Sequence, residues 1–124
     1  MPQLTGRRTR VLVVEDHEDS RVGLVRLLQK HGHEVRGCAT LAAGLGELID
    51  WLPECVVLDL MLPDGLGVQI LRNIREHRVP VRVGIVNAAV DPSLLAEVDA
   101  LEPNATYRKP LDLPALLQWI SGKS

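Results

Sequence analysis

Short apolar runs alternate along the chain with longer segments in which apolar residues recur every three or four positions. The short runs, rich in Val, Ile and Leu, predict strands, whereas the longer spacing is typical of helices with one buried face. The predicted strands are residues 10–15, 34–38, 54–59, 81–87 and 105–108. Helical patterns follow them, around residues 24–28, 41–52, 70–74, 94–101 and 113–120. Five strands are therefore expected to alternate with five helices.

The first, third and fourth predicted strands are apolar at nearly every position. Strands of this kind are covered by helices on both faces, and parallel strands joined by helices connect through right-handed crossovers. We therefore expect an α/β fold with a doubly wound, five-stranded parallel sheet. Asp91 and Pro92 mark the start of the fourth helix, because the Asp side chain caps free N–H groups and Pro lacks the N–H that would go unpaired.

The composition fits one compact domain. The chain has 124 residues, of which 46% are hydrophobic and 24% charged, enough for a single core. The net charge of −2 excludes the strongly basic surface with which whole domains bind nucleic acid. We expect an N-terminal tail at residues 1–9, which includes the basic Arg7 and Arg8, then a domain at residues 10–122, and no direct contact with nucleic acid.

No apolar stretch approaches the ~20 residues of a membrane span, and the N-terminus lacks the apolar run of a secretory signal. We therefore expect a cytoplasmic protein that does not contact a membrane. Cys38 and Cys55 lack the paired spacing of a metal site and are expected to be reduced thiols in the core.

Acidic residues gather directly after the first predicted strand. Four acids lie within five positions there: Glu15, Asp16, Glu18 and Asp19. In open α/β sheets, ligands bind outside the carboxyl ends of the strands. A nucleotide or flavin site would need a glycine-rich loop that accepts anions at this place. The acidic loop instead favours a cation.

Asp59 and Lys109 end two further predicted strands. Asp59 has three apolar residues on either side, and a buried, unpaired carboxylate is unfavourable unless water or a cation compensates it. A solvent-facing loop aspartate is the alternative. Lys109, one of only three Lys residues, precedes Pro110. Its compact ammonium suits a point contact with a carboxylate or phosphoryl oxygen; an ordinary surface lysine before a turn is the alternative.

Together these groups suit Mg²⁺, which takes one or two carboxylates and keeps waters or phosphate oxygens at its other positions. The implied chemistry is phosphoryl transfer to Asp59, with the metal and Lys109 neutralising charge. A phosphatase that turns over through a phospho-aspartate would need a second Asp two residues later as general acid, where Met61 stands. We therefore do not expect an enzyme of this class.

Three motifs resemble the receiver domain of two-component response regulators. They are V-L-V-V-E-D at residues 11–16, V-V-L-D-L-M-L-P-D-G-L-G at residues 56–67 and K-P at residues 109–110. The resemblance covers about residues 9–121. It implies a flavodoxin-like (βα)5 fold with strand order 2-1-3-4-5, and a role in phosphorelay signalling through an altered surface that an unknown downstream protein recognises.

The resemblance also implies roles for individual residues. Asp59 would accept the phosphoryl group, and Lys109 and Asn87 would contact it. The Mg²⁺ ligands would be Asp59, Asp16, Glu15 through a water, and the backbone carbonyl of Met61. Gly67 would admit a tight approach of the chain to the helix. The donor would be the phosphohistidine of a sensor histidine kinase or phosphotransfer protein, docking near residues 20–28.

Two positions depart from the family's usual pattern. Thr or Ser usually ends the fourth strand, but Asn87 stands here; its amide can still donate a hydrogen bond. The usual aromatic switch residue, three positions before the lysine, is replaced by Thr106, with Tyr107 one position later. A one-residue offset sends a side chain to the other face of a strand unless a bulge restores the register. A phosphorylation-independent interaction module therefore remains the alternative function.

Overall fold

The computed structural model describes residues 8–88 and 91–122. Within them, five strands form one parallel sheet: β1 (Arg10–Val14), β2 (Glu34–Cys38), β3 (Cys55–Asp59), β6 (Arg82–Asn87) and β7 (Ala105–Arg108). The strand order is β2-β1-β3-β6-β7, which is the expected 2-1-3-4-5 order when these five strands are counted along the chain. The predicted fold class is confirmed.

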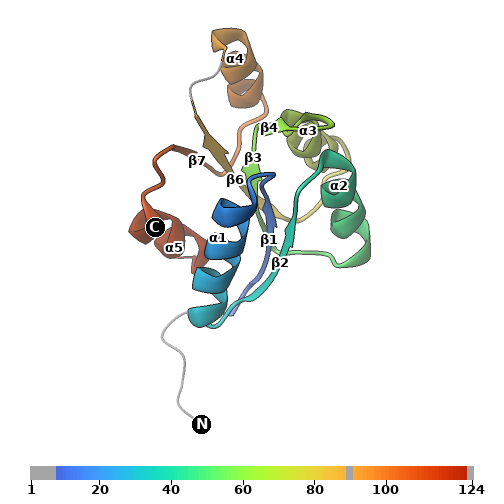
Figure 1. Cartoon of the computed structure of the whole chain (residues 1–124). Helices are drawn as coiled ribbons and strands as arrows, with labels where there is room; N and C mark the ends of the chain where they lie inside the picture. The colour runs from blue at the N-terminus through green and yellow to red at the C-terminus, as the bar shows by residue number, and fades with distance from the viewer. Residues whose placement is uncertain (1–7, 89–90, 123–124) are drawn as a thin grey trace.

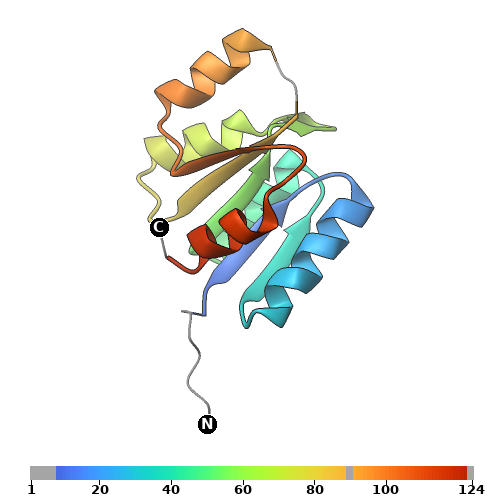
Figure 2. The same cartoon turned by 90° about the vertical axis from the view of Figure 1, so that its left-hand side faces the viewer.

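Five helices cover the two faces of this sheet (Figures 1 and 2). They are α1 (Glu18–Lys30), α2 (Leu41–Asp50), α3 (Val68–Glu76), α4 (Pro92–Ala100) and α5 (Leu113–Ile120). A short hairpin, β4 (Met61–Leu62) and β5 (Gly65–Leu66), follows β3 and was not predicted. Two residues per strand are too few to show any periodicity.

Polar side chains define where several helices begin. His17, Thr40, Asp91 and Asp112 each accept a hydrogen bond from a backbone N–H in the first turn of α1, α2, α4 and α5. Such caps satisfy N–H groups that have no partner within the helix. The start predicted at Asp91 and Pro92 is confirmed.

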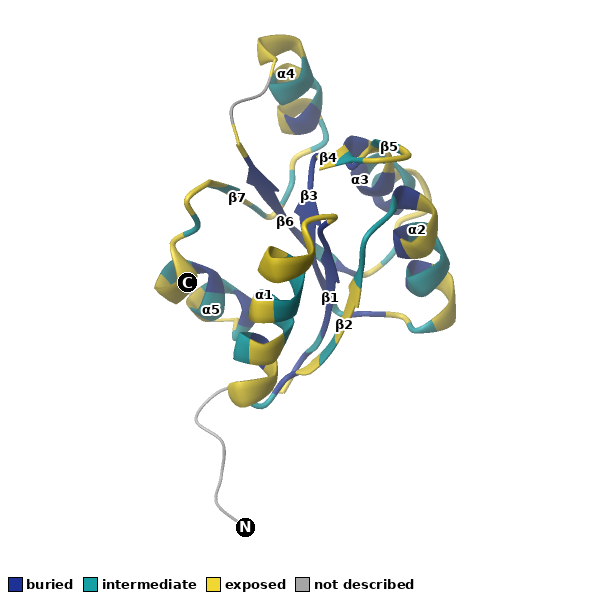
Figure 3. Cartoon of the chain, viewed as in Figure 1, coloured by how far each residue is buried: buried dark blue, intermediate teal, exposed yellow. Residues whose placement is uncertain are grey.

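Apolar residues fill both sides of the sheet. One buried cluster joins the sheet to α1 and α5 through Val11, Val13, Val57, Leu28, Leu116 and Ile120. The other joins it to α2, α3 and α4 through Leu12, Val56, Leu58, Leu48, Ile74 and Val98. All five residues of β3 are buried, whereas the edge strands β2 and β7 are largely exposed or half-buried (Figure 3). The near-continuous apolar runs in the sequence therefore correspond to strands covered on both faces.

The start of the domain is packed from Thr9 onward. Thr9 is buried, and its N–H donates to Nδ1 of His33 at 3.1 Å. Residues 1–7 of the predicted tail lie outside the described residues. Within the described part of the chain, no helix has the length and apolarity needed to cross a membrane.

The register of the sheet determines which residues meet at its carboxyl edge. Asp59 pairs with Val86 between β3 and β6, and Asn87 pairs with Arg108 between β6 and β7. The residues that leave these strands therefore lie side by side, together with the loop that follows β1.

Candidate functional site

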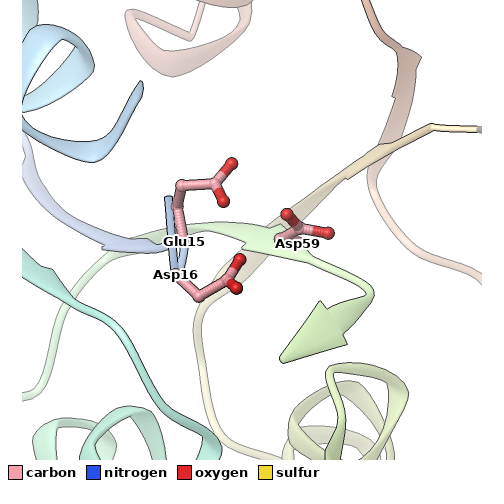
Figure 4. A group of neighbouring side chains, drawn as sticks. All are labelled: Glu15, Asp16 and Asp59. Carbon is pink, nitrogen blue, oxygen red and sulfur yellow. The ribbon is translucent and has the colours of Figure 1, made fainter. Parts of the chain in front are cut away.

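Three carboxylates converge at the carboxyl edge of the sheet. Glu15 and Asp16 follow β1, and Asp59 ends the adjacent β3 (Figure 4). One carboxylate oxygen from each lies within 4.8 Å of the others. The Glu15 and Asp59 side chains are each only 11% exposed, whereas Asp16 is exposed. The fold thus brings Asp59 next to Glu15 and Asp16, which precede it by more than forty residues in the sequence.

Lys109 reaches these carboxylates from the loop that follows β7. Its Nζ lies 3.0 Å from Oε1 of Glu15 and 3.2 Å from Oδ2 of Asp59. Partial burial alone would lower the pKa of the Lys109 ammonium, but the hydrogen bond to Glu15 and the charges of Asp59 and Glu15 outweigh it and raise the pKa. Lys109 therefore carries its charge at neutral pH and faces Asp59 as a cation.

The acidic cluster suits a divalent cation. With all groups ionised, three carboxylates and one ammonium carry a net charge of −2. Burial raises the pKa of Glu15, which the backbone N–H of His17 and the side chain of Lys109 partly oppose by hydrogen bonding. Hard oxygen ligands crowded in this way are the donor set that Mg²⁺ prefers. The residues present therefore fit the predicted metal.

Asn87 and Met61 flank the cluster. Asn87 is buried, with only 3% of its surface exposed. Its backbone carbonyl accepts the N–H of Lys109 at 2.7 Å. The Met61 N–H donates to Oδ1 of Asp59 at 3.1 Å, and its side chain points outward, 54% exposed. The roles predicted for the Asn87 amide and the Met61 carbonyl remain predictions.

Gly67 closes the loop behind Asp59. A Cβ at this position would collide with the backbone carbonyl oxygen of Asp59, and the Gly67 N–H donates to the carbonyl of Leu60 at 2.8 Å. The sequence analysis expected a tight approach of the chain to the helix at Gly67. The structure shows this approach at the backbone of Asp59 instead. A larger residue would displace the end of β3.

Two side chains that the sequence analysis did not single out for this site support its loops. Asp64, in the hairpin after Asp59, accepts the N–H groups of Leu41 at 2.7 Å and Ala42 at 3.0 Å, and these bonds lower its pKa. Arg21, in α1, donates to backbone carbonyls of the acidic loop. Neither partner could be deduced from the sequence, because Asp64-Gly65 matches an ordinary turn and Arg21 an ordinary polar helix position.

The pairing of β7 with β6 is regular at the altered switch position. Ile85 pairs with Thr106, and Val86 with Tyr107, with no bulge between them. Thr106 is exposed, whereas Tyr107 is half-buried, and its ring meets that of Trp119 in α5 edge-on at 6.5 Å. Tyr107 therefore faces α5, as the one-residue offset predicts.

A cavity of about 370 Å³ opens beside the cluster, between α1 and the loop that leads to α5. Its apolar lining includes Leu24 and Leu27 from α1 and Leu111 and Leu113 from the opposite side. Its polar end is formed by Glu15, Asp59 and Lys109. This cavity forms a mostly apolar groove that ends at the acidic site.

Residues 11–121 match the response regulator receiver domain family. The chain belongs to this family. The match confirms the resemblance carried by the three motifs, and it places the chain among regulatory domains of two-component systems. Receiver domains of this family bind Mg²⁺ at an acidic pocket and interact with kinases and downstream effectors. In this chain, Glu15, Asp16 and Asp59 form an acidic cluster.

The chain matches only part of each of its curated relatives. The KDP operon transcriptional regulatory protein KdpE of Escherichia coli is 41% identical over 76 residues, which are 60% of this chain and 34% of KdpE. The sensory/regulatory protein RpfC of Xanthomonas campestris pv. campestris is 29% identical over 123 residues, 93% of this chain and 16% of RpfC. The chain thus spans about a third or less of these relatives.

Solved structures share the fold. A response regulator receiver protein from Pseudomonas putida superposes with a TM-score of 0.85 at 24% identity, covering 96% of this chain and 100% of that one. A DNA-binding response regulator of the LuxR family from Staphylococcus aureus gives a TM-score of 0.84 at 22% identity, covering 92% and 97%. These similarities confirm the flavodoxin-like receiver fold.

Proposed function

We propose that this receiver domain accepts a phosphoryl group on Asp59 from the phosphohistidine of a sensor histidine kinase or phosphotransfer protein. One observation carries the proposal: the buried carboxylate of Asp59 lies where two other carboxylates and the Lys109 ammonium meet. This arrangement places a nucleophile between a cation site and a fixed positive charge, as phosphoryl transfer requires.

In the proposed reaction, a carboxylate oxygen of Asp59 attacks phosphorus. A P–O bond forms as the P–N bond to the donor imidazole breaks, and the imidazole leaves with the electron pair and takes up a proton. Lys109, 3.2 Å from Asp59, is placed to contact a phosphoryl oxygen. Mg²⁺, when bound, supplies further charge neutralisation. Asp59, Asp16, Glu15 through a water, and the backbone carbonyl of Met61 would hold it.

The Asn87 amide would take the place of the hydroxyl that usually contacts the phosphoryl group. Asn87 is buried at the end of β6, the strand that pairs with β3, which ends at Asp59. An amide N–H can donate to a phosphoryl oxygen. The position of Asn87 next to the end of β3 supports the role.

The donor protein would dock on the groove between α1 and the loop before α5. The groove presents apolar side chains next to the acidic end where Asp59 and Lys109 lie. An apolar helix face carrying the phosphohistidine would bury against Leu24 and Leu27 and bring phosphorus to Asp59. Docking near residues 20–28 is therefore retained in the proposal. The domain acts as a regulatory phosphoacceptor, and a downstream protein recognises its changed surface.

Intact-mass measurement tests the proposal. Incubation with acetyl phosphate and Mg²⁺ should add the mass of one phosphoryl group, and removal of Mg²⁺ should abolish the adduct. Asp59→Asn should give none, whereas Asp99→Asn, the same change at an exposed position in α4, should behave as wild type. An adduct that persists in Asp59→Asn, or one that forms without a divalent cation, would contradict the assigned roles.

A second function is favoured by the two departures from the family's pattern. Asn87 replaces the hydroxyl, and Tyr107 packs against α5. A receiver-like module that binds its partner without phosphorylation would retain the acidic site but not use it. A folded wild-type chain that takes no phosphoryl group at any Mg²⁺ concentration would favour this function.

A further inference from the structure

Arg21, near the start of α1, contacts the backbone of the acidic loop that follows β1. Its Nη1 donates to the backbone carbonyl of Glu15 at 2.9 Å and to that of Asp16 at 3.3 Å. One guanidinium therefore binds the backbone of the two consecutive residues whose carboxylates point into the site. We propose that Arg21 is a positioning residue that holds this loop in its Mg²⁺-binding geometry, an inference that rests on the proposed function of the site.

Arg21 and the loop that it binds are both anchored to neighbouring elements. The backbone N–H of Arg21 donates to the carbonyl of His17 at 2.9 Å, which fixes the first turn of α1. The side-chain stem crosses β2 at Gly37, where a Cβ would lie 3.1 Å from Cγ and 3.3 Å from Cδ of Arg21. Glu15 is also anchored to β2, since its N–H donates to the carbonyl of Cys38 at 3.0 Å. Arg21 thus links β2, α1 and the loop after β1.

Both contacts of Arg21 are made to carbonyl oxygens, so neither carboxylate is neutralised by it. The Glu15 carboxylate accepts hydrogen bonds from the Lys109 ammonium and from the backbone N–H of His17. Among the described residues, the Asp16 carboxylate accepts no hydrogen bond. Charge-assisted hydrogen bonds to backbone carbonyls fix the direction of the chain more strongly than neutral ones. Partners that orient metal ligands in this way typically contribute ten- to a hundredfold to metal affinity.

The sign of the effect separates positioning from simple electrostatics. Arg21 is a positive charge near a cation site, so its removal would strengthen Mg²⁺ binding if charge alone mattered. If the guanidinium positions the loop, its removal weakens Mg²⁺ binding. The two explanations therefore predict changes in opposite directions.

The test is Mg²⁺ titration of the full unphosphorylated chain by isothermal calorimetry. Arg21→Gln should weaken Mg²⁺ binding about tenfold. Arg21→Lys keeps the charge but replaces the rigid, planar guanidinium with a compact ammonium on a flexible stem, and should lie between wild type and Arg21→Gln. Arg26→Gln, the same loss of charge at an exposed position of the same helix, is the matched control and should leave the affinity unchanged or slightly higher.

Gly37→Ala is a second route that leaves Arg21 in place. The added methyl would press on the Arg21 stem, and equally on Cγ2 of Val25, so Mg²⁺ affinity should fall a few-fold while the charge of the chain is constant. Gly46→Ala, where a Cβ meets nothing within 4 Å, is its control. Thermal melts in the absence of Mg²⁺ identify any variant that is unfolded, and the remaining variants decide the question.

The outcomes distinguish the inference from the proposed function. If wild type binds Mg²⁺ and is phosphorylated, but Arg21→Gln and Gly37→Ala both bind Mg²⁺ as well as their controls, the positioning role is overturned. If wild type neither binds Mg²⁺ nor takes a phosphoryl group, the proposed function itself fails. Weaker binding in Arg21→Gln together with an unchanged Arg26→Gln supports the positioning role.

Discussion

At the scale of single residues, His33 couples the start of the domain to pH. The residue is buried, and its Nδ1 accepts the N–H of Thr9 at 3.1 Å. Burial, together with the nearby charge of His31, lowers the pKa of His33 from its ordinary value of 6.5. A proton on Nδ1 would break the hydrogen bond to Thr9, so the folded state resists protonation.

This arrangement predicts a loss of stability in mild acid. Because the pKa of His33 is lower in the folded than in the unfolded chain, the unfolded chain binds more protons between the two values, and the free energy of unfolding falls as pH drops below about 6.5. His33→Asn retains an acceptor for Thr9 but cannot be protonated, so its unfolding free energy should decline less. Urea unfolding at pH values above and below 6.5 measures the difference.

The exposed His77 provides the control for this prediction. His77→Asn removes a histidine whose Nδ1 lies 3.0 Å from the carbonyl of Asn73 at the end of α3. It is the same substitution at an exposed position, against which the pH dependence of His33→Asn is compared. Equal pH dependence in wild type and His33→Asn would show that another group is responsible.

Asn87 leads to a second prediction at this scale. If its amide donates to the phosphoryl group, Asn87→Ala should slow phosphorylation by acetyl phosphate about tenfold or more, since a hydrogen bond to a charged group contributes about 1.5–3 kcal/mol. Asn87→Ser restores a donor and should recover most of the rate. The time course of the intact-mass adduct measures both. An alanine variant as fast as wild type would remove Asn87 from the site.

At the scale of elements, α5 packs closely against β6 at Gly84 and Arg82. A Cβ on Gly84 of β6 would lie 2.7 Å from the ring of Trp119. Arg82 lies over the same ring at 5.1 Å and donates to the carbonyls of Trp119 and Ile120 at 2.6 and 2.8 Å. Arg82 thus caps the C-terminal turn of α5 from the sheet, and the Trp119 indole packs directly against Gly84.

This packing predicts that Gly84→Ala destabilises the domain. The methyl group would force Trp119 outward, and overpacking of this kind typically costs about 1–3 kcal/mol. Gly46→Ala, in α2, meets no atom within 4 Å and should instead stabilise the helix by up to about 1 kcal/mol. Urea unfolding followed by tryptophan fluorescence measures both changes. A Gly84→Ala variant as stable as wild type would show that α5 can shift without cost.

The elements show what the sequence could and could not predict. The five strands were predictable from short apolar runs, and the five helices from apolar residues spaced three or four apart. The meeting of Asp59 and Lys109 was predictable because strands of a parallel sheet end at one edge. The hairpin after Asp59 was too short to show a period. The contacts of Arg21 and Asp64 depend on side-chain direction and on pairing with distant segments, which residue type and spacing do not encode.

At the scale of the whole molecule, the site exists only when the sheet is assembled. Glu15 and Asp16 follow β1, Asp59 ends β3, and Lys109 follows β7. The two chain segments that hold the carboxylates come together through the register of β1 with β3. The unfolded chain therefore has no such site, and any ligand of the cluster binds the folded state alone.

Mg²⁺ should for this reason stabilise the whole domain. A ligand that binds only the folded state at a hundred times its Kd adds about 2.7 kcal/mol to the free energy of unfolding, and a chelator should reverse the gain. Asp59→Asn removes one of the three carboxylates and should lose most of this gain, whereas Asp99→Asn should keep it. Thermal melts over a range of Mg²⁺ concentrations measure the effect. An equal rise of Tm in wild type and Asp59→Asn would mean that the ion binds elsewhere, because a site formed by the ends of β1 and β3 cannot lose Asp59 without losing affinity.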